Sequence, residues 1–370
     1  MKTARFHTWL GATAGAMLCC SSLPLKGEGA HVVRRTESQV ISGQTASGKK
    51  IEVKIPYGEI IYRGIFNPVS KGVDNLQFGL KFQRPPKTNG GWDGWNFLRV
   101  TTIVNHRPVQ IFKRWLLEDA EVLETGQRTL VQFHWPLDDA GTAMVVTTIQ
   151  YPTHPDWIFV RLSMRGESAF LDTIDLSCFP GNTSGPPERE RWLASLHRED
   201  AVNPRGVPFG PEDDSFVFFN QMAQTNSGCL LVIAPHIPES LSIFGQVQTR
   251  VKCKPETQEM CFALGGYDGR STEEVIRVFR MEGAANTRNF LNDIDWTPRL
   301  ETEAHERLIR NLEQILAESK ETVSSALFQK LKDDYLKARD EQRNEDAIRV
   351  VQQLSELKEQ SIRSALQQWK

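Results

Sequence analysis

The sequence has little net charge, and this shortage counts against two kinds of partner. Its 44 Lys and Arg residues nearly balance its 46 Asp and Glu residues, which gives a formal net charge of -2. A near-neutral chain lacks the strong overall charge that attracts a nucleic-acid backbone or an anionic membrane surface. We therefore expect no nucleic-acid partner.

The familiar motifs of catalysis and cofactor binding are also missing. The chain has no G-x-S-x-G, no H-E-x-x-H, no phosphate-binding loop and no G-x-G-x-x-G between a strand and a helix. Their absence counts against serine hydrolases, zinc peptidases and nucleotide enzymes. The cysteines lack C-x2-C spacing and nearby histidine partners, so we expect no metal site and no cofactor.

Long apolar runs are confined to the first thirty residues, which read as an export signal. A cationic start precedes an apolar stretch over residues 9–18 that is too short to span a bilayer. Two cleavage patterns stay open: an A-x-A signal at residues 14–16, and a lipoprotein-like start at residues 19–22, where Leu18 departs from the usual small residue. We expect residues 1–30 to be a signal peptide. The protein is then periplasmic, in the cell envelope or extracellular, and either free or anchored in a membrane by an N-terminal lipid.

What the chain does contain, from about residue 50 to 282, is a series of short stretches in which apolar and polar residues alternate. Each stretch closes on Gly, Pro, Asn or Asp, which is typical of consecutive antiparallel strands. Clear examples begin at Ile51, Leu76, Leu98, Val131 and Trp157. So many strands with short links exceed one flat sheet. We therefore expect a mainly β fold, with a large two-sheet antiparallel β-sandwich over residues 31–285.

After Trp296 the pattern becomes helical. No Gly or Pro occurs beyond Pro298, and apolar residues recur at helical spacing to the end of the chain. Asn344, which two acidic residues follow, fits a helix N-cap. We expect a linker over residues 286–300 and a charged α-helical tail over residues 301–370, either a hairpin or a three-helix segment. Its apolar stripe faces the β domain or, alternatively, another copy of the chain in a homo-oligomer.

The four cysteines beyond the predicted signal could pair in an oxidising compartment. The best local pair is Cys253 with Cys261. Residues 248–254 and 259–264 read as two strands around a turn at residues 255–258, which would place the two cysteines opposite each other. The alternative is two buried thiols.

Nine tryptophans provide candidates for carbohydrate binding. Trp92 and Trp95 flank Asp93 in a glycine-rich stretch, and Trp192 lies in a proline-rich interruption over residues 180–211. The apolar face of a pyranose stacks on an aromatic ring, while carboxylate and amide groups bind its hydroxyls. The alternative is that these tryptophans fill the space between the sheets.

Two polar residues share one face of the predicted strand over residues 130–135. Gln132 and His134 alternate there with apolar residues, which take the other face. If the polar face lines a cleft, His134 serves as a base or as a ligand for a sugar. The alternative is a solvated sheet face.

Two neighbouring phrases carry a resemblance to a known class. Residues 147–152, Thr-Thr-Ile-Gln-Tyr-Pro, and residues 155–160, Pro-Asp-Trp-Ile-Phe-Val, give a strand that ends in an aromatic residue, a turn with proline and a returning apolar strand. With the order of elements from Leu76 to Arg280, this resembles the galactose mutarotase-like, or supersandwich, class of carbohydrate-active proteins. The resemblance implies that fold and a sugar-handling context. The catalytic histidine and glutamate arrangement of the mutarotases has no match in this chain, so no catalytic residue carries over.

Three functions stay open. The first is an exported protein that binds a glycan or oligosaccharide through loop aromatics without turnover. The second is a carbohydrate-active enzyme on the same scaffold, a lyase, epimerase or glycosidase, which a gathering of His134 with two carboxylates and an arginine in one concave site would favour. The third is a structural cell-envelope protein that oligomerises through its helical tail. The carbohydrate-binding residues that we predict are Trp92, Asp93, Trp95, Gln132, His134 and Trp192.

Overall fold

The computed structural model describes most of the chain beyond the first thirty residues. The described residues are 31–41, 44–54, 60–66, 78–82, 93–111, 119–124, 127–138, 140–179, 191–201, 206–210, 212–220, 227–234, 238–244, 248–319 and 322–368. The predicted signal peptide lies outside them.

The β domain consists of a ten-stranded sheet, sheet A, and a nine-stranded sheet, sheet B. The order in sheet A is β1-β2-β3-β4-β5-β11-β18-β17-β14, with β6 paired to β5, and the order in sheet B is β13-β12-β15-β16-β19-β10-β9-β8-β7. Sheet A contains β1 (His31–Ile41), β2 (Gln44–Lys54), β3 (Ile60–Phe66), β4 (Phe78–Phe82), β5 (Asp93–Val104), β6 (Arg107–Gln110), β11 (Ala169–Phe179), β14 (Val207–Phe209), β17 (Ser240–Phe244) and β18 (Gln248–Lys252). Sheet B contains β7 (Asp119–Glu124), β8 (Thr129–Pro136), β9 (Ala143–Gln150), β10 (Trp157–Arg165), β12 (Arg191–Ser195), β13 (Glu199–Ala201), β15 (Ser215–Asn220), β16 (Ser227–Ala234) and β19 (Glu259–Asp268).

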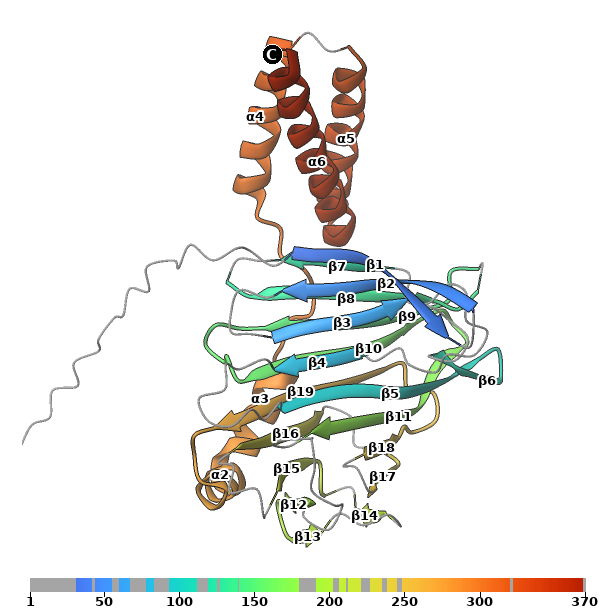
Figure 1. Cartoon of the computed structure of the whole chain (residues 1–370), viewed down its shortest axis with the longest axis vertical. Coiled ribbons are helices and arrows are strands. Elements are labelled where there is room, and N and C mark those ends of the chain that lie inside the picture. Colours follow the sequence, from blue (N-terminus) through green and yellow to red (C-terminus); the bar gives the residue numbers. More distant parts are fainter. Residues whose placement is uncertain are drawn as a thin grey trace, which may run out of the picture.

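The two sheets pack face to face (Figure 1). Val131, Phe133 and Trp135 of β8 share one buried cluster with Ile174 and Leu176 of β11. Every second residue of a strand points into this space, so alternation along the sequence supplies the core. Burial of each such side chain contributes roughly 1.5–3 kcal/mol. The predicted fold class, an antiparallel β-sandwich followed by helices, is confirmed.

The predicted hairpin over residues 248–264 is wrong, and so is the predicted disulfide. β18 pairs with β11 and β17 in sheet A, whereas β19 pairs with β10 and β16 in sheet B. The turn between them therefore crosses from one sheet to the other. Cys253 packs between the sheets, and Cys261 packs on the opposite face of sheet B. Both are buried free thiols.

The end of the region that we predicted as strands is helical instead. α2 (Thr272–Val278), the π-helix η3 (Phe279–Gly283) and α3 (Ala284–Asn292) follow one another without a break. The hydroxyl of Ser271 accepts the backbone N–H of Glu274 at 3.2 Å and caps the first helix. Apolar side chains of these helices cover the outer face of sheet B, which is itself apolar at this end. The need to bury that second sheet face explains the helices.

The tail is a three-helix bundle. Its helices are α4 (Thr302–Ser319), α5 (Thr322–Asp340) and α6 (Asn344–Gln368). Leu312, Tyr335 and Leu354 are buried where the three helices meet, so the apolar stripe is covered largely within the bundle. Figure 1 shows the bundle at the end of the sandwich that carries β1 and β7, and α6 contacts β7. Self-association through the tail stays a prediction. Among the described helices, none combines the length and apolar character needed to cross a membrane.

Candidate functional site

A buried arginine holds the linker, which in the structure is residues 293–301 between α3 and α4. The side chain of Arg128 is fully buried, and its terminal nitrogens donate to the carbonyl oxygens of Asp295 and of Thr297, the latter at 2.7 Å. Its Nε lies 3.0 Å from both carboxylate oxygens of Glu124. Glu124 also accepts the backbone N–H of Arg299 at 3.1 Å. These contacts fix the linker and the start of α4 against sheet B.

A row of polar side chains crosses the outer face of sheet B at this junction. Glu121, Gln132, Thr147 and Arg161 lie opposite one another on β7, β8, β9 and β10. Their neighbours along each strand point into the sandwich, so alternation places these four on the outer face. We call them the polar row. His134 lies two residues further along β8, with its Nε2 3.7 Å from a carboxylate oxygen of Glu121.

Several atoms in and beside the polar row are buried without a hydrogen bond. Among the described residues, no partner is found for Oε1 of Gln132, Oγ1 of Thr147, Nε of Arg161 or Nε2 of His134. Each unpaired buried polar group costs roughly 1–3 kcal/mol, and proteins leave few of them. Their gathering on three adjacent strands marks a place where a ligand or ordered water completes the hydrogen bonding.

The first turns of α6 lie against the polar row. Glu345 accepts hydrogen bonds from Nε2 of Gln132 and from Arg165, each at 3.0 Å. Arg349, one turn later, donates to Glu121 at 2.9 Å. The helix therefore contacts the sheet through paired charges rather than through apolar packing at this point.

Glu121 is held as a carboxylate anion. Burial raises its pKa, but the nearby imidazole of His134 and the hydrogen bond from Arg349 outweigh that effect, and the pKa lies below the usual value. An ionised carboxylate cannot donate a proton to a leaving group. His134 thus lies near two carboxylates and an arginine, and the second carboxylate, Glu345, is also paired to an arginine. The hollow described below is lined by other residues, so these groups do not share that concave site.

Arg161 ends the polar row, and its ion pair is longer than those of the nearby Arg165 and Arg349. Its guanidinium carbon lies 5.4 Å from the centre of the Trp296 ring, within the range of a cation–π contact. Its NH1 lies 4.0 Å from a carboxylate oxygen of Glu259. By contrast, Arg165 and Arg349 have carboxylate oxygens at 3.0 Å and 2.9 Å.

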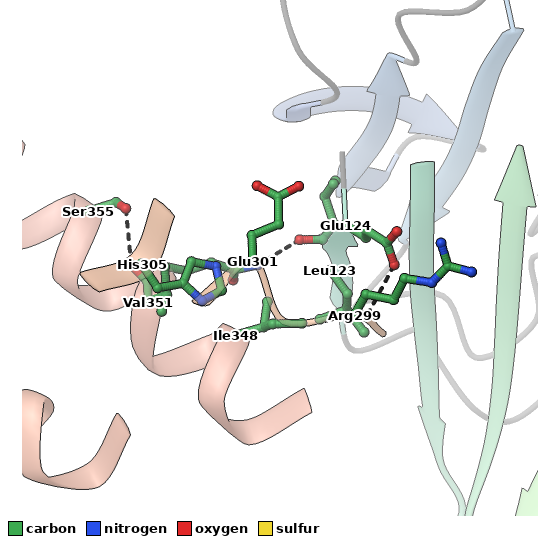
Figure 2. A pocket seen from close by; sticks show the side chains of 10 residues that line it. Leu123, Glu124, Arg299, Glu301, His305, Ile348, Val351 and Ser355 are labelled. Atoms are coloured by element: carbon green, nitrogen blue, oxygen red, sulfur yellow. Dashed lines mark hydrogen bonds between the residues drawn. The ribbon is translucent and has the colours of Figure 1, made fainter. Parts of the chain in front are cut away.

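An open hollow of about 320 Å³ lies on the other side of the α6 start, between β7, the linker and α6. Its walls are formed by Val122, Leu123, Glu124, Arg299, Glu301, His305, Ile348, Val351, Gln352 and Ser355. Figure 2 shows that the side chains reach it from the sheet, from the linker with the start of α4, and from α6. This volume lies near the lower end of the range of small-molecule sites, about 300–1,000 Å³.

The polar groups of the hollow differ in how firmly they are held. Nε2 of Gln352 donates to the carbonyl oxygen of Val122 at 2.7 Å, so this amide is fixed. Burial lowers the pKa of His305 despite the opposing charge of Glu301, and the imidazole is neutral at neutral pH. Its Nδ1 has no hydrogen-bond partner within the described ranges. In the same ranges, no cluster of three or more His, Cys, Asp or Glu side chains is arranged to hold a metal ion.

The described part of the glycine-rich stretch does not present its aromatic ring to a sugar. Trp92 lies outside the described residues, and Asp93 begins β5. Trp95 is fully buried, donates from Nε1 to the carbonyl oxygen of Gly265 at 3.0 Å, and packs edge-on against Phe218. The prediction that Trp95 stacks on a sugar is therefore wrong, because its ring fills the space between the sheets.

The other predicted residues are divided between two places. Gln132 and His134 lie on one face of β8, as their alternation predicts, and their role in carbohydrate binding stays a prediction. Trp192 is half-buried in β12, and five strands of sheet B separate it from β8. At about 4.8 Å per strand it is roughly 29 Å away, so it belongs to a different region.

Sequence reasoning missed Thr147, Arg161 and the hollow. One signal was present, because Arg161 and Ser163 alternate with apolar residues in the strand of residues 157–164. The register in which β9 pairs with β8 and with β10 joins Gln132 to Thr147 and Arg161, and no single strand of the sequence shows that register.

No protein-family model and no curated protein matches the chain. Among solved structures, the α-N-acetylgalactosaminidase NagBb from Bifidobacterium bifidum in complex with GalNAc is 10% identical, with a TM-score of 0.41 over 66% of this chain and 38% of that one. A putative kojibiose phosphorylase from the human microbiome is 9% identical, with a TM-score of 0.30 over 65% of this chain and 32% of that one. The chain thus spans less than half the length of either protein. At these values the likeness decides nothing about function, and the predicted membership of the galactose mutarotase-like class stays a prediction.

Proposed function

We propose that this protein is an exported carbohydrate-binding protein that holds a saccharide unit in the hollow beside β7 without turning it over. The observation that carries the proposal is the make-up of the hollow, which combines apolar and polar side chains around about 320 Å³. A pyranose has the same two kinds of surface, an apolar face of C–H groups and an edge of hydroxyls. A site with apolar contact area and a few placed polar groups fits such a ligand.

The individual groups support the same ligand class. Leu123, Ile348 and Val351 supply apolar area from two elements that face each other across the hollow. Nδ1 of neutral His305 is buried and has no hydrogen-bond partner in the described ranges, and a ligand hydroxyl that reaches it would supply one. The exposed carboxylate of Glu301 accepts hydroxyl hydrogen bonds, which are stronger than those to a neutral acceptor.

The carboxylates of the hollow favour binding over hydrolysis. Glycoside cleavage needs two carboxyl groups, of which one donates a proton and the other attacks or activates water. Both oxygens of Glu124 lie against Arg128, and one of them also accepts the N–H of Arg299. Glu124 is therefore occupied in holding the linker, which leaves Glu301 as the only acid that lines the described hollow without such ties.

A glycan-array screen followed by calorimetry with the best glycan tests this function. Glu301→Ala should weaken binding about tenfold or more, as expected for the loss of a charged hydrogen-bond acceptor. Glu303→Ala is the matched control, because Glu303 is also exposed and acidic, lies two residues away and does not line the hollow. Failure of the array to show any glycan, or equal losses in the two variants, would refute the proposal.

Export rests on the sequence of residues 1–30. N-terminal analysis of the protein recovered from the periplasm or the medium tests it. A chain that keeps residue 1 and stays inside the cell would contradict export, whereas an acylated cysteine at position 19 or 20 would identify the lipid-anchored form.

A further inference from the structure

We propose that Arg161 and the polar row form a second binding site, separate from the hollow, that takes the carboxylate of an acidic ligand. The charge pairing at the junction leads to this site. Arg349 pairs with Glu121 and Arg165 pairs with Glu345, each through a hydrogen bond near 3 Å. Arg161 is left with one oxygen of Glu259 at 4.0 Å.

A cation in this position lacks sufficient compensation. The Nε of Arg161 is buried and has no hydrogen-bond partner in the described part of the chain. A guanidinium that is partly removed from water without a close counter-charge is costly, and a carboxylate offsets that cost with short, charge-assisted hydrogen bonds. Arginine presents its donors in a planar fork that matches the two oxygens of a carboxylate.

The groups next to Arg161 complete such a site. The hydroxyl of Thr147, directly opposite on β9, is buried without a partner in the described residues and is able to donate to an anion. Nε2 of His134, on the same sheet face, makes no hydrogen bond and has Glu121 at 3.7 Å. The ring of Trp296 lies over the guanidinium and limits access of water to it.

A ligand would approach this site from the side of Glu259, which lies opposite Ser163, two residues along β10 from Arg161. The side chains of Arg161 and Glu259 are 24% and 45% exposed, whereas Thr147 is fully buried. A ligand therefore enters beside Glu259 and directs its anionic end toward Thr147. Because Glu259 is acidic and stands at the entrance, a small monoanion fits better than a polyanion. A free carboxylic acid and a uronic acid unit of a glycan share this chemistry.

Nitrogen-15 spectra of the arginine Nε–H groups test the site directly, with sodium acetate, sodium D-galacturonate and D-galactose as ligands. Acetate and galacturonate should shift the Arg161 signal, while galactose should leave it in place. Equal affinity for the two anions identifies a site for free carboxylates, and tighter binding of galacturonate identifies an acidic saccharide. A galactose shift as large as that of galacturonate, or no shift with either anion, overturns the proposal.

Variants separate this site from general charge effects. Arg161→Gln should weaken acetate binding roughly tenfold or more. Arg270→Gln is the control, because Arg270 also has one long ion pair, 3.9 Å to Asp156, and it should bind as the parent does. Equal losses in both variants contradict the assignment.

A second pair of variants serves if Arg161→Gln does not fold. Thr147→Val removes the hydroxyl from the polar row, and Thr129→Val removes an equally buried, unpartnered hydroxyl that faces into the sandwich. Only Thr147→Val should weaken acetate binding, by several-fold. Glu301→Ala should leave acetate binding unchanged, so failure of the hollow as a glycan site and failure of this site are distinguishable.

Discussion

The Nε of Arg128 lies 3.0 Å from both carboxylate oxygens of Glu124, and both side chains are buried. The pair links the end of β7 to the residue before β8, and the terminal nitrogens of Arg128 donate to the carbonyl oxygens of Asp295 and Thr297. A contact that is local in sequence therefore fixes a linker about 170 residues later. The position of the helical bundle against β7 depends on this pair.

Arg128→Met should destabilise the protein by about 3–5 kcal/mol, because it leaves the buried carboxylate of Glu124 without its counter-charge. Urea denaturation followed by circular dichroism measures the change. Arg310→Met is the control, since Arg310 also pairs with a glutamate four residues earlier, but its side chain is 67% exposed. That change should cost less than about 0.5 kcal/mol. Similar losses in both variants would contradict the role of burial.

Trp95→Phe should cost about 3 kcal/mol in the free energy of unfolding. The change removes the donor to the buried carbonyl oxygen of Gly265, worth roughly 1–3 kcal/mol, and part of the ring volume between the sheets. Urea denaturation measures the loss, and calorimetry at a temperature where the variant is folded should show unchanged glycan affinity. A folded variant that has lost glycan binding would restore the sugar-platform interpretation of Trp95.

Alternation of residues predicts which face of a strand is polar, and it does so correctly for Gln132 and His134. It does not say which face is solvated, because both faces of sheet B are covered, one by sheet A and one by helices. Trp95, in a strand of sheet A near glycines, likewise lies on a covered face and points into the sandwich. Glycine content signals a turn or a close approach and carries no information on the direction of the neighbouring ring.

Pairing between distant strands is the part that local sequence leaves open. The two predicted strands, residues 248–254 with Cys253 and residues 259–264 with Cys261, are consecutive and joined by a four-residue turn pattern, which predicts a hairpin. In the structure β18 pairs with its neighbour β17 and with the distant β11 in sheet A, whereas β19 pairs with the distant β10 and β16 in sheet B. The polar row, by contrast, crosses four consecutive strands, β7 to β10, and depends on their register, so that site was not predictable from any one strand.

Cys253 and Cys261 should resist alkylation in the native protein. Burial raises the pKa of each thiol to about 12, so at pH 8 only about one molecule in ten thousand carries the reactive thiolate. Iodoacetamide followed by peptide mass spectrometry should label neither residue in buffer and both in urea without reductant. Labelling in urea that requires prior reduction would show a disulfide and contradict the placement of the two residues in different sheets.

The stability of the protein should fall as the pH drops below about 6.5, with His305 as one cause. Burial lowers the pKa of this imidazole in the folded state, so the unfolded chain binds the proton first. Above pH 6.5 the imidazole is neutral in both the folded and the unfolded state, so it does not change the stability with pH. Below pH 6.5, protonation of the unfolded state favours unfolding until the pH reaches the folded pKa.

Urea denaturation between pH 8 and pH 5 measures the slope, that is, how steeply the free energy of unfolding changes with pH. His305→Gln should reduce it, whereas His197→Gln, at an exposed position, should leave it as in the parent. An unchanged slope in His305→Gln would contradict the burial of this imidazole in the folded protein.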